Sequence, residues 1–386
     1  MIETIDDAAD FARLEPEWKA VLGSSPSNCL FLTWEWLHTW WKHLAGERRL
    51  HVLVVRSDRS LQAVAPLAVR PRYLSRLRPF SALEFLGTGS VGSDYLDLIV
   101  RRDQEAPVLK ALADHLAHGT LMLELAQVRK DRSLARSLAE AITRQGWSQF
   151  ALKTAVCPFI DLSGQSWRSY LTSLGPAHRA NLLRRLRNLE RRYEVRFEEV
   201  ATEAERGEAL ALLVRLHNLR WRNLGGSTAF YLPGLLAFHD EFSALALQRG
   251  WLRLFVLRLD GRAVAALYGF RYGRTFYFYQ SGFDPAFGSY SVGLVTMGLT
   301  IRRAIEEGAS EFDLLHGAEA YKFLWAREAR ELERLEIYPP RASGALHKGF
   351  NEASRGARSL ARQVLSRTAA NRTAAAETVR DEEGIG

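Results

Sequence analysis

Residues 252–270 read LRLFVLRLDGRAVAALYGF. Two apolar runs flank the dipeptide Asp260-Gly261, which favours a tight hairpin turn, so antiparallel strands are predicted at 251–259 and 262–270. Residues 50–69, LHVLVVRSDRSLQAVAPLAV, repeat this pattern, and Pro66 predicts a sheet edge or a bulge in the second strand. Two similar hairpins, one in each half of the chain, indicate an internal duplication.

The elements that follow the two hairpins also match. A predicted helix at 105–118 ends at Gly119 and one at 292–307 ends at Gly308, and glycine is favourable directly after a helix. An acidic residue, Glu124 or Asp313, lies five positions after each glycine. Further strands are expected at 96–100, 121–125, 150–154, 193–200, 275–279, 311–315 and 332–338, and further helices at 134–142, 205–221 and 319–326. The sequence predicts an α/β chain with mixed α+β sheets in two tandem domains, 1–158 and 159–340, and a basic tail at 341–386.

The composition agrees with two globular domains. The chain has 386 residues, of which 47% are apolar and 25% charged, enough for a core in each half. The net charge of +8 favours anionic partners such as phosphorylated substrates, coenzyme A, nucleic acid or an anionic membrane surface. Residues 1–15 do not resemble a signal peptide, and no apolar run is long enough to span a bilayer, so a cytoplasmic location is expected. Cys29 and Cys157 are expected in the core, and no metal site is expected.

Basic residues concentrate between 163 and 196. Apolar residues share one face of a predicted helix there, and the other face carries Arg184, Arg185, Arg187, Arg191 and Arg192. These arginines either form a solvated face or contact phosphate or an anionic surface. The tail beyond Pro340 has few large apolar residues and is expected to be partly helical or disordered, and dispensable for folding.

A glycine-rich loop, SGFDPAFGSYSVGLV at 281–295, leads into the predicted helix at 292–307. Glycine lets the backbone N–H groups of a helix start approach a phosphate closely, and a serine can cap the helix. The predicted cofactor-binding residues are Gly282, Gly288, Ser289, Ser291 and Gly293. The equivalent loop of the first half, 101–107, has no glycine, two acidic residues and Pro107, so only the second domain is expected to hold the cofactor.

Polar residues gather after the predicted strand at 311–315, in DLLHGAEAYKFLW (313–325). Ligands bind at such carboxyl ends of strands in open sheets. The candidate catalytic residues are Asp313, His316 and Glu319 as proton acceptors, Tyr321 as the proton donor to a thiolate, and Lys322 for a phosphate or an oxyanion. The candidate acceptor-binding residues are His217, Arg220 and Trp221, for which a structural role is equally open. The tryptophans at 34, 36, 40 and 41 have helical spacing and are expected in the core or at the domain interface.

Four stretches resemble the CelD/BcsL-type acetyltransferase family: FLTWEWLHTWW (31–41), AVAPL (63–67), LHNLRW (216–221) and FDLLHGAEAYK (312–322) with Trp325. The resemblance covers residues 10–340, although the family usually has arginine at the position of His316. It implies two tandem GNAT folds related to Fem-type peptidyltransferases, and acyl transfer from acetyl-CoA or another acyl-CoA. In the GNAT superfamily, whose element order the second half shares, pantetheine lies between two splayed parallel strands and the pyrophosphate rests on the next helix. The family is associated with bacterial cellulose and exopolysaccharide synthesis.

The reaction expected from these features is direct attack on the thioester by an amine, or less favourably a hydroxyl, of a small-molecule or sugar-linked cell-envelope precursor. No GxGxxG follows the first strand, and no Walker loop, HExxH or GxSxG occurs. Two alternatives stay open: a Fem-like transferase that takes aminoacyl-tRNA as donor, and a non-catalytic binding subunit of a polysaccharide synthase complex. DNA is not expected as a partner, RNA is expected only under the first alternative, and the basic helix could contact an anionic membrane.

Overall fold

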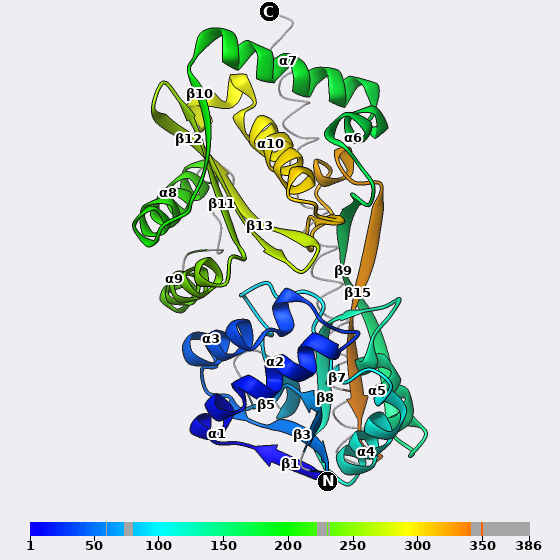
Figure 1. The fold of residues 1–386 in the computed structure, drawn as a ribbon. Helices are drawn as coiled ribbons and strands as arrows, with labels where there is room; N and C mark the ends of the chain where they lie inside the picture. Colours follow the sequence, from blue (N-terminus) through cyan, green and yellow to red (C-terminus); the bar gives the residue numbers. More distant parts are fainter. Residues whose placement is uncertain (59, 73–79, 222–229, 231, 341–348, 350–386) are drawn as a thin grey trace, which may run out of the picture.

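The computed structural model describes residues 1–58, 60–72, 80–221, 230, 232–340 and 349 (Figure 1). The predicted tail at 341–386 lies outside these residues apart from Gly349. The described chain is a mixed α/β fold, as predicted.

The first half packs helices against the strands of two sheets. Its strands are β1 (Ile2–Ile5), β2 (Arg49–Leu50), β3 (Val52–Ser57), β4 (Ser60–Ala65), β5 (Leu67–Arg70), β6 (Ala82–Phe85), β7 (Ile99–Val100), β8 (Met122–Arg129) and β9 (Ser148–Asp161). Its helices are α1 (Ala8–Arg13), α2 (Glu15–Ser24), the 3-10 helix η1 (Leu30–Leu32), α3 (Trp34–Leu44), α4 (Glu105–Ala117) and α5 (Leu134–Thr143).

The second half places helices on both faces of its strands (Figure 1). Its strands are β10 (Val195–Glu199), β11 (Leu252–Leu259), β12 (Arg262–Tyr272), β13 (Thr275–Phe283), β14 (Glu311–Asp313) and β15 (Glu328–Tyr338). Its helices are α6 (Trp167–Ser173), α7 (Pro176–Arg192), α8 (Glu203–Trp221), α9 (Pro233–Gln248) and α10 (Val292–Glu306), with the 3-10 helices η3 (Pro285–Tyr290) and η4 (Lys322–Leu324).

Two sheets organise the described strands. Four strands form the sheet β1-β3-β4-β7, and eleven form a continuous sheet in the order β10-β11-β12-β13-β14-β9-β15-β8-β6-β5-β2. Pro66 separates β4 from β5, and these two pieces of the predicted strand at 61–69 join different sheets. The sheet edge or bulge predicted at Pro66 is instead a break between two strands, each of which has a neighbour on both sides.

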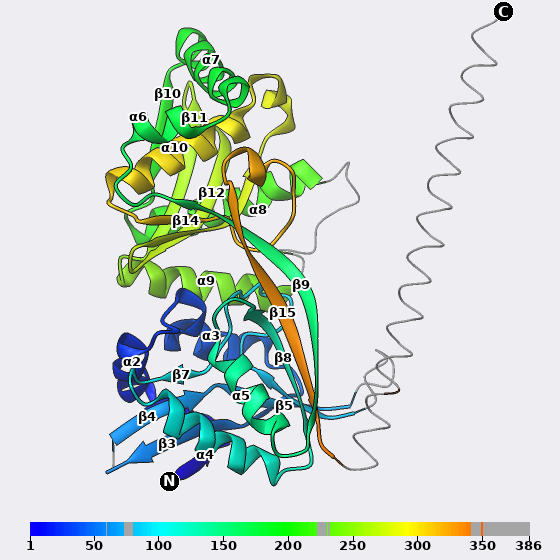
Figure 2. The same ribbon diagram turned by 90° about the vertical axis from the view of Figure 1, so that its right-hand side faces the viewer.

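The final strands of the two halves are exchanged. β9 ends the first half but pairs with β14 through Phe159–Asp161, whereas β15 ends the second half and pairs with β8 through Leu332–Ile337. β9 and β15 also pair with each other along their length and run side by side between the halves (Figure 2). The predicted domain division at residue 158 falls inside β9 and stays a prediction.

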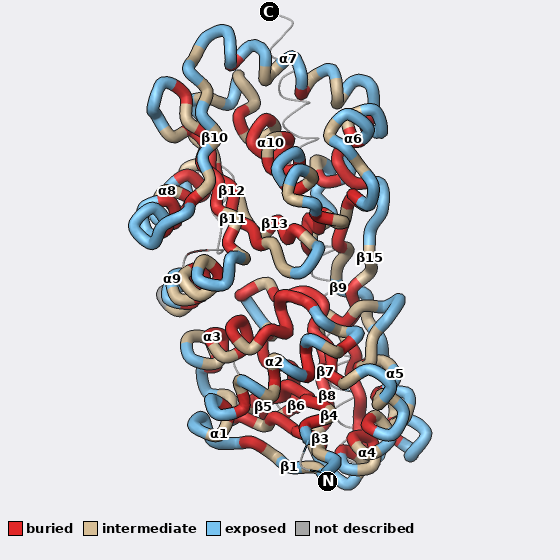
Figure 3. Tube along the Cα trace, in the orientation of Figure 1, coloured by how far each residue is buried: buried red, intermediate tan, exposed pale blue. Residues whose placement is uncertain are grey.

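Within the described residues, each half contains one parallel strand pair with a helix between its strands in the sequence. β6 pairs with β8 around α4, and β13 pairs with β14 around α10. The repeated arrangement agrees with the duplication inferred from the two hairpins. Buried residues follow the strands and α10, while the outer face of α7 is exposed (Figure 3).

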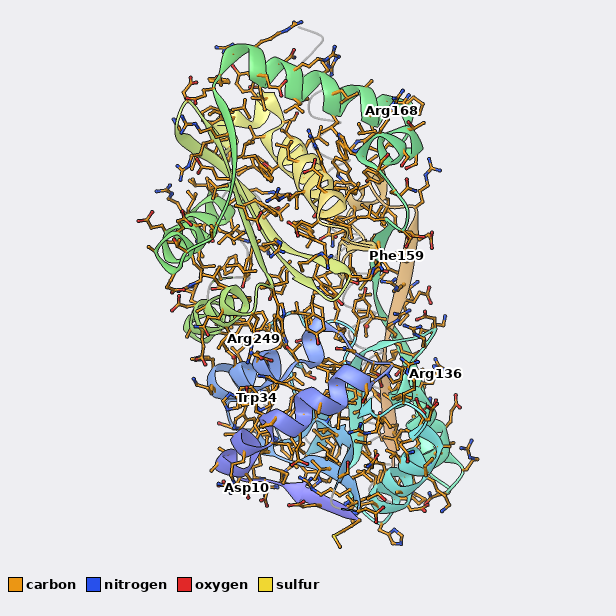
Figure 4. The ribbon with its side chains drawn as sticks, viewed as in Figure 1. Asp10, Trp34, Arg136, Phe159, Arg168 and Arg249 are labelled. Carbon is orange, nitrogen blue, oxygen red and sulfur yellow. The ribbon has the colours of Figure 1, made fainter. Side chains whose placement is uncertain are left out.

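The two halves meet at α3 and α9. Trp36 of α3 is fully buried, and its ring lies edge-on to Phe238 and Phe242 of α9 at centroid distances of 4.9 and 4.7 Å. Figure 4 marks Trp34 and Arg249 beside this contact. The core or interface position predicted for the tryptophans is confirmed: Trp36 and Trp40 are buried, and Trp34 and Trp41 are partly buried against the same core. Both cysteines are buried as expected.

Two secondary-structure predictions are wrong. The helix predicted at 319–326 is only η4, because Leu315 and Gly317 adopt φ values of 55° and 128° and lead the chain into a loop. The strand predicted at 96–100 is reduced to β7, since the carboxylate of Asp97 turns away to accept the N–H groups of Leu134 and Ala135 at the start of α5. Several further elements had no counterpart in the prediction, among them β1, α1, α2, β6 and α9.

Candidate active site

Strands β13 and β14 form a fork. They pair in parallel only where Thr275–Tyr277 lies beside Glu311–Asp313, and β13 then continues to Phe283. Within the described chain, no strand covers the edge of β13 turned toward β14 beyond Tyr277. The β12–β13 register shifts by one residue at Tyr279, just past the fork point, and such bulges re-aim side chains next to active sites.

A cavity of about 270 Å³ lies beside the fork. Its wall combines β12, the end of β13, the start of α10 and the segment from Tyr321 to Trp325. It contains four of the five predicted cofactor residues, Gly282, Gly288, Ser291 and Gly293. The fifth, Ser289, is outside the wall, and its carbonyl accepts a 2.6 Å hydrogen bond from Nη1 of Arg185 on α7.

The start of α10 carries no side-chain cap, so the predicted capping by Ser289 or Ser291 is wrong. Ser291 has a left-handed φ of 56°, which directs the chain sharply into the helix. No side chain therefore caps the first-turn N–H groups of α10. Such N–H groups at the N-terminus of a helix favour the binding of an anion.

Gly282 is needed where α8 crosses β13. A Cβ atom at this position would lie 2.4 Å from the backbone nitrogen of His217. The ring of His217 is buried, with Nδ1 3.2 Å from the carbonyl of Ser281, and this burial lowers the pKa of its imidazole. Arg220 lines the cavity with its guanidinium 5.1 Å from the centre of the Phe283 ring. The side chain of Trp221, the last residue of α8, lies outside the described residues.

Tyr321 is the predicted catalytic residue that lines this cavity. Burial, followed by the charge of Glu319, raises the pKa of its hydroxyl to about 12, so the hydroxyl stays protonated at neutral pH. The side chains of Asp313, His316 and Lys322 are not part of the cavity wall. Of the predicted catalytic cluster, Tyr321 alone therefore contributes to the wall of this cavity.

His316 contacts the first half of the chain. Its Nδ1 lies 3.0 Å from each carboxylate oxygen of Asp94, and its backbone N–H donates a 2.9 Å hydrogen bond to Oδ2 of the same residue. The His316 side chain is 45% exposed, so the ring is accessible to a substrate.

Lys322 holds the turn that carries His316. Its buried Nζ donates hydrogen bonds of 3.3 and 2.7 Å to the carbonyls of Leu315 and His316, and it lies 3.1 Å from Oε2 of Glu319. Glu319 is more than half exposed. The geometry gives Lys322 a clear positioning role, while the predicted roles of both residues in catalysis stay predictions.

A second cavity of about 520 Å³ lies between the two halves. Asp313 and Arg330 contribute to its wall from the second half, and Tyr95, Asp97 and Arg129 from the first. The guanidinium of Arg330 also lies 3.7 Å from the ring centre of Phe159, which Figure 4 marks on β9. The cavity is polar and adjoins the carboxyl end of β14.

Asp94 and Tyr95 were missed by the sequence interpretation. Both lie within the run GTGSVGSDYLD at 87–97, in which three closely spaced glycines precede Ser93, Asp94 and Tyr95. A cluster of glycines between two strands signals a loop that can approach another part of the chain. That signal marks the loop, but it does not reveal that the loop reaches His316 across the fold.

Comparisons with known proteins agree with this geometry. Residues 176–323 match the family described as "Acetyltransferase (GNAT) domain". FemX superposes with a TM-score of 0.57 at 13% identity, covering 83% of this chain and 95% of FemX. The carboxy-terminal domain of a putative lysylphosphatidylglycerol synthetase from Agrobacterium fabrum superposes with a TM-score of 0.53 at 12% identity, and the match covers 90% of this chain and 96% of that domain. A conserved protein of unknown function from Bacteroides thetaiotaomicron superposes with a TM-score of 0.54 at 15% identity, and the match covers 87% of this chain and 99% of that protein. No curated protein matches the sequence.

The fold and the matched domain define an acyltransferase-type enzyme with a GNAT acetyltransferase domain in its second half. The predicted fold class is confirmed, whereas the finer CelD/BcsL resemblance stays a prediction. None of the described helices is long and apolar enough to cross a membrane. In the described part of the chain, no group of three or more His, Cys, Asp or Glu residues is arranged to hold a metal ion.

Proposed function

We propose that this enzyme transfers an acyl group from acetyl-CoA or another acyl-CoA to an amine on a sugar or amino-acid-derived precursor of the cell envelope or of an exopolysaccharide. The observation that carries the proposal is the fork between β13 and β14, with a cavity beside it and an uncapped helix start at its end. In a GNAT domain these are the places for the pantetheine arm and the pyrophosphate.

The residues at the fork suit an acyl-CoA donor. The unpaired strand edge from Phe278 to Phe283 offers backbone groups to the amides of pantetheine, since an extended ligand can pair with a free edge. The apolar wall, which includes Leu267, Met297 and Trp325, suits the aliphatic part of the arm. The start of α10 and the nearby Arg185 suit the negative phosphates.

The chemistry is a direct transfer. The amine nitrogen attacks the thioester carbonyl, the new C–N bond forms, the C–S bond breaks, and the amine gives up one proton. Tyr321, protonated and placed in the donor cavity, returns a proton to the departing thiolate. A cysteine intermediate is disfavoured because Cys29 and Cys157 are buried, and burial raises the pKa of the Cys29 thiol to about 12 and that of Cys157 further.

An aminoacyl-tRNA donor is the second candidate, and helix α7 favours it. Arg184, Arg187 and Arg191 are exposed on this helix, with no ion pair to a described acidic residue. RNA phosphates would release counterions there, so activity would fall steeply with salt. We propose that the same exposed arginines also contact an anionic membrane surface or a polysaccharide synthase complex in the cytoplasm.

A thermal-shift panel separates these donors. The panel contains acetyl-CoA, longer acyl-CoA thioesters, free CoA and aminoacyl-tRNA at low and moderate salt. A donor at 100 times its dissociation constant adds about 2.7 kcal/mol to the free energy of unfolding and raises the melting temperature. We expect acyl-CoA to give this shift. A shift with aminoacyl-tRNA alone would favour the second candidate, and no shift with either donor would favour a non-catalytic binding subunit.

A further inference from the structure

We propose that His316 accepts the proton of the acceptor amine and that Asp94, from the first half of the chain, is its positioning residue. The proposal deepens the acyl transfer proposed above and rests on it. Under this proposal, the first half contributes Asp94 and the second half contributes His316, so neither half is sufficient for the reaction.

The contacts around Asp94 fix the orientation of the imidazole. The carboxylate accepts the backbone N–H of His316 and lies 3.0 Å from Nδ1 through each oxygen, so the backbone and the ring are held by one group. Asp94 is fully buried, and Nε2 of Gln127 donates a 2.9 Å hydrogen bond to its Oδ1. A carboxylate at Nδ1 keeps the neutral ring protonated on that nitrogen and leaves the Nε2 lone pair free to take a proton.

The ring lies beside the point where β13 and β14 separate. β13 and β14 separate after Tyr277 and Asp313, and His316 lies three residues beyond the latter. A Cβ atom at Gly92, beside Asp94, would be 3.3 Å from Cε1 of His316 and 3.8 Å from the hydroxyl of Tyr279. The loop of the first half therefore closes directly against the fork.

The charges around His316 suit a proton acceptor. The carboxylate of Asp94, through its charge and its hydrogen bond, raises the pKa of His316 above the usual value. Burial and the ammonium of Lys322 oppose this increase, and Glu319 adds to it. Asp94 also stabilises the imidazolium that forms when Nε2 takes the amine proton, and solvent then removes that proton. Thiolate protonation by Tyr321 is a separate proton transfer on the cavity side of the fork.

Two variants test the pair, His316→Gln and Asp94→Asn, with Asp103→Asn as a control because this exposed aspartate lies in the 101–104 loop, away from the fork. NMR titration of the His316 ring, assigned by its loss in His316→Gln, is the direct readout. Asp94→Asn removes the charge that raises the pKa, so we expect the His316 titration to move to lower pH. Asp103→Asn should leave it in place.

Steady-state kinetics supply the second readout. A base that must be neutral gives a rate that rises with pH through its pKa, so the rising limb of Asp94→Asn should shift to lower pH with a reduced plateau. His316→Gln should lose ~10²–10⁴-fold in kcat while still binding acyl-CoA. An unchanged His316 titration in Asp94→Asn, or a wild-type rate in His316→Gln, would overturn the inference. Failure of the wild type to bind any acyl-CoA would instead contradict the proposed donor.

Discussion

The hydroxyl of Tyr95 donates a 2.6 Å hydrogen bond to Oδ2 of Asp313, and this contact joins a loop of the first half to the end of β14. Asp313 is fully buried, and Nη1 of Arg330 lies 3.3 Å from the same oxygen. Burial, the largest effect, raises the pKa of the Asp313 carboxyl to about 7, while Tyr95 and Arg330 lower it. The junction between the halves thus contains a carboxyl group that titrates near neutral pH.

We predict that Asp313 makes stability depend on pH. An unfolded aspartate ionises near pH 4, whereas the folded carboxyl keeps its proton until about pH 7. Between these values unfolding releases a proton, so the contribution of this group is full below about pH 4 and is lost as the pH rises to 7, by up to about 1.4 kcal/mol per pH unit. Urea unfolding of wild type and Asp313→Asn from pH 4.5 to 8 measures the difference. Parallel curves for the two proteins would show that Asp313 is ionised throughout this range.

The crossing of α8 over β13 gives a prediction about stability. Gly282→Ala places a methyl group 2.4 Å from the His217 backbone nitrogen, which cannot move without shifting the helix. We expect a loss of about 1–3 kcal/mol in urea unfolding. Gly207→Ala is the matched control because no atom lies within 4 Å of its added Cβ, and within α8 it should gain about 0.5–1 kcal/mol. Equal stability of the two variants would mean that α8 does not press on β13 as described.

Tyr321 gives a prediction about catalysis. Tyr321→Phe removes the hydroxyl that protonates the thiolate but leaves the cavity wall nearly unchanged. We expect kcat to fall by ~10²-fold or more with little change in the dissociation constant of acyl-CoA. The control Tyr272→Phe, which loses only the hydrogen bond to Asn28, should keep the wild-type rate. A normal kcat in Tyr321→Phe would assign the proton to water or to another residue.

The sequence predicted the features that depend on local pattern. The hairpin at Asp260-Gly261 and the helix that ends at Gly308 both follow from turn and helix-end chemistry, which neighbouring residues determine. The sequence at 319–326 suits a helix, but only the short η4 forms there. The hydrogen bonds from Lys322 to the carbonyls of Leu315 and His316 stabilise an irregular loop instead. Tertiary contacts overrode local preference there.

In the candidate site, too, local features could be predicted from the sequence and long-range contacts could not. The glycine-rich donor loop was visible because phosphate binding at a helix start has a local signature. The pairing of His316 with Asp94 was not visible, since 222 residues separate them and the contact forms only when the two halves of the chain pack against each other. Long-range contacts of this kind leave no spacing pattern in one sequence.

The central claim is that the second half alone holds one acyl-CoA at the start of α10, and calorimetric titration tests it most directly. Gly293→Glu adds a carboxylate at the cavity wall, where even a Cβ atom would lie 3.2 Å from the Phe283 ring, whereas Pro107→Glu adds the same charge to the exposed start of α4 in the first half. We predict one acetyl-CoA per chain for wild type and Pro107→Glu, and no binding for Gly293→Glu. Two molecules per chain, or binding that survives Gly293→Glu, would contradict the account.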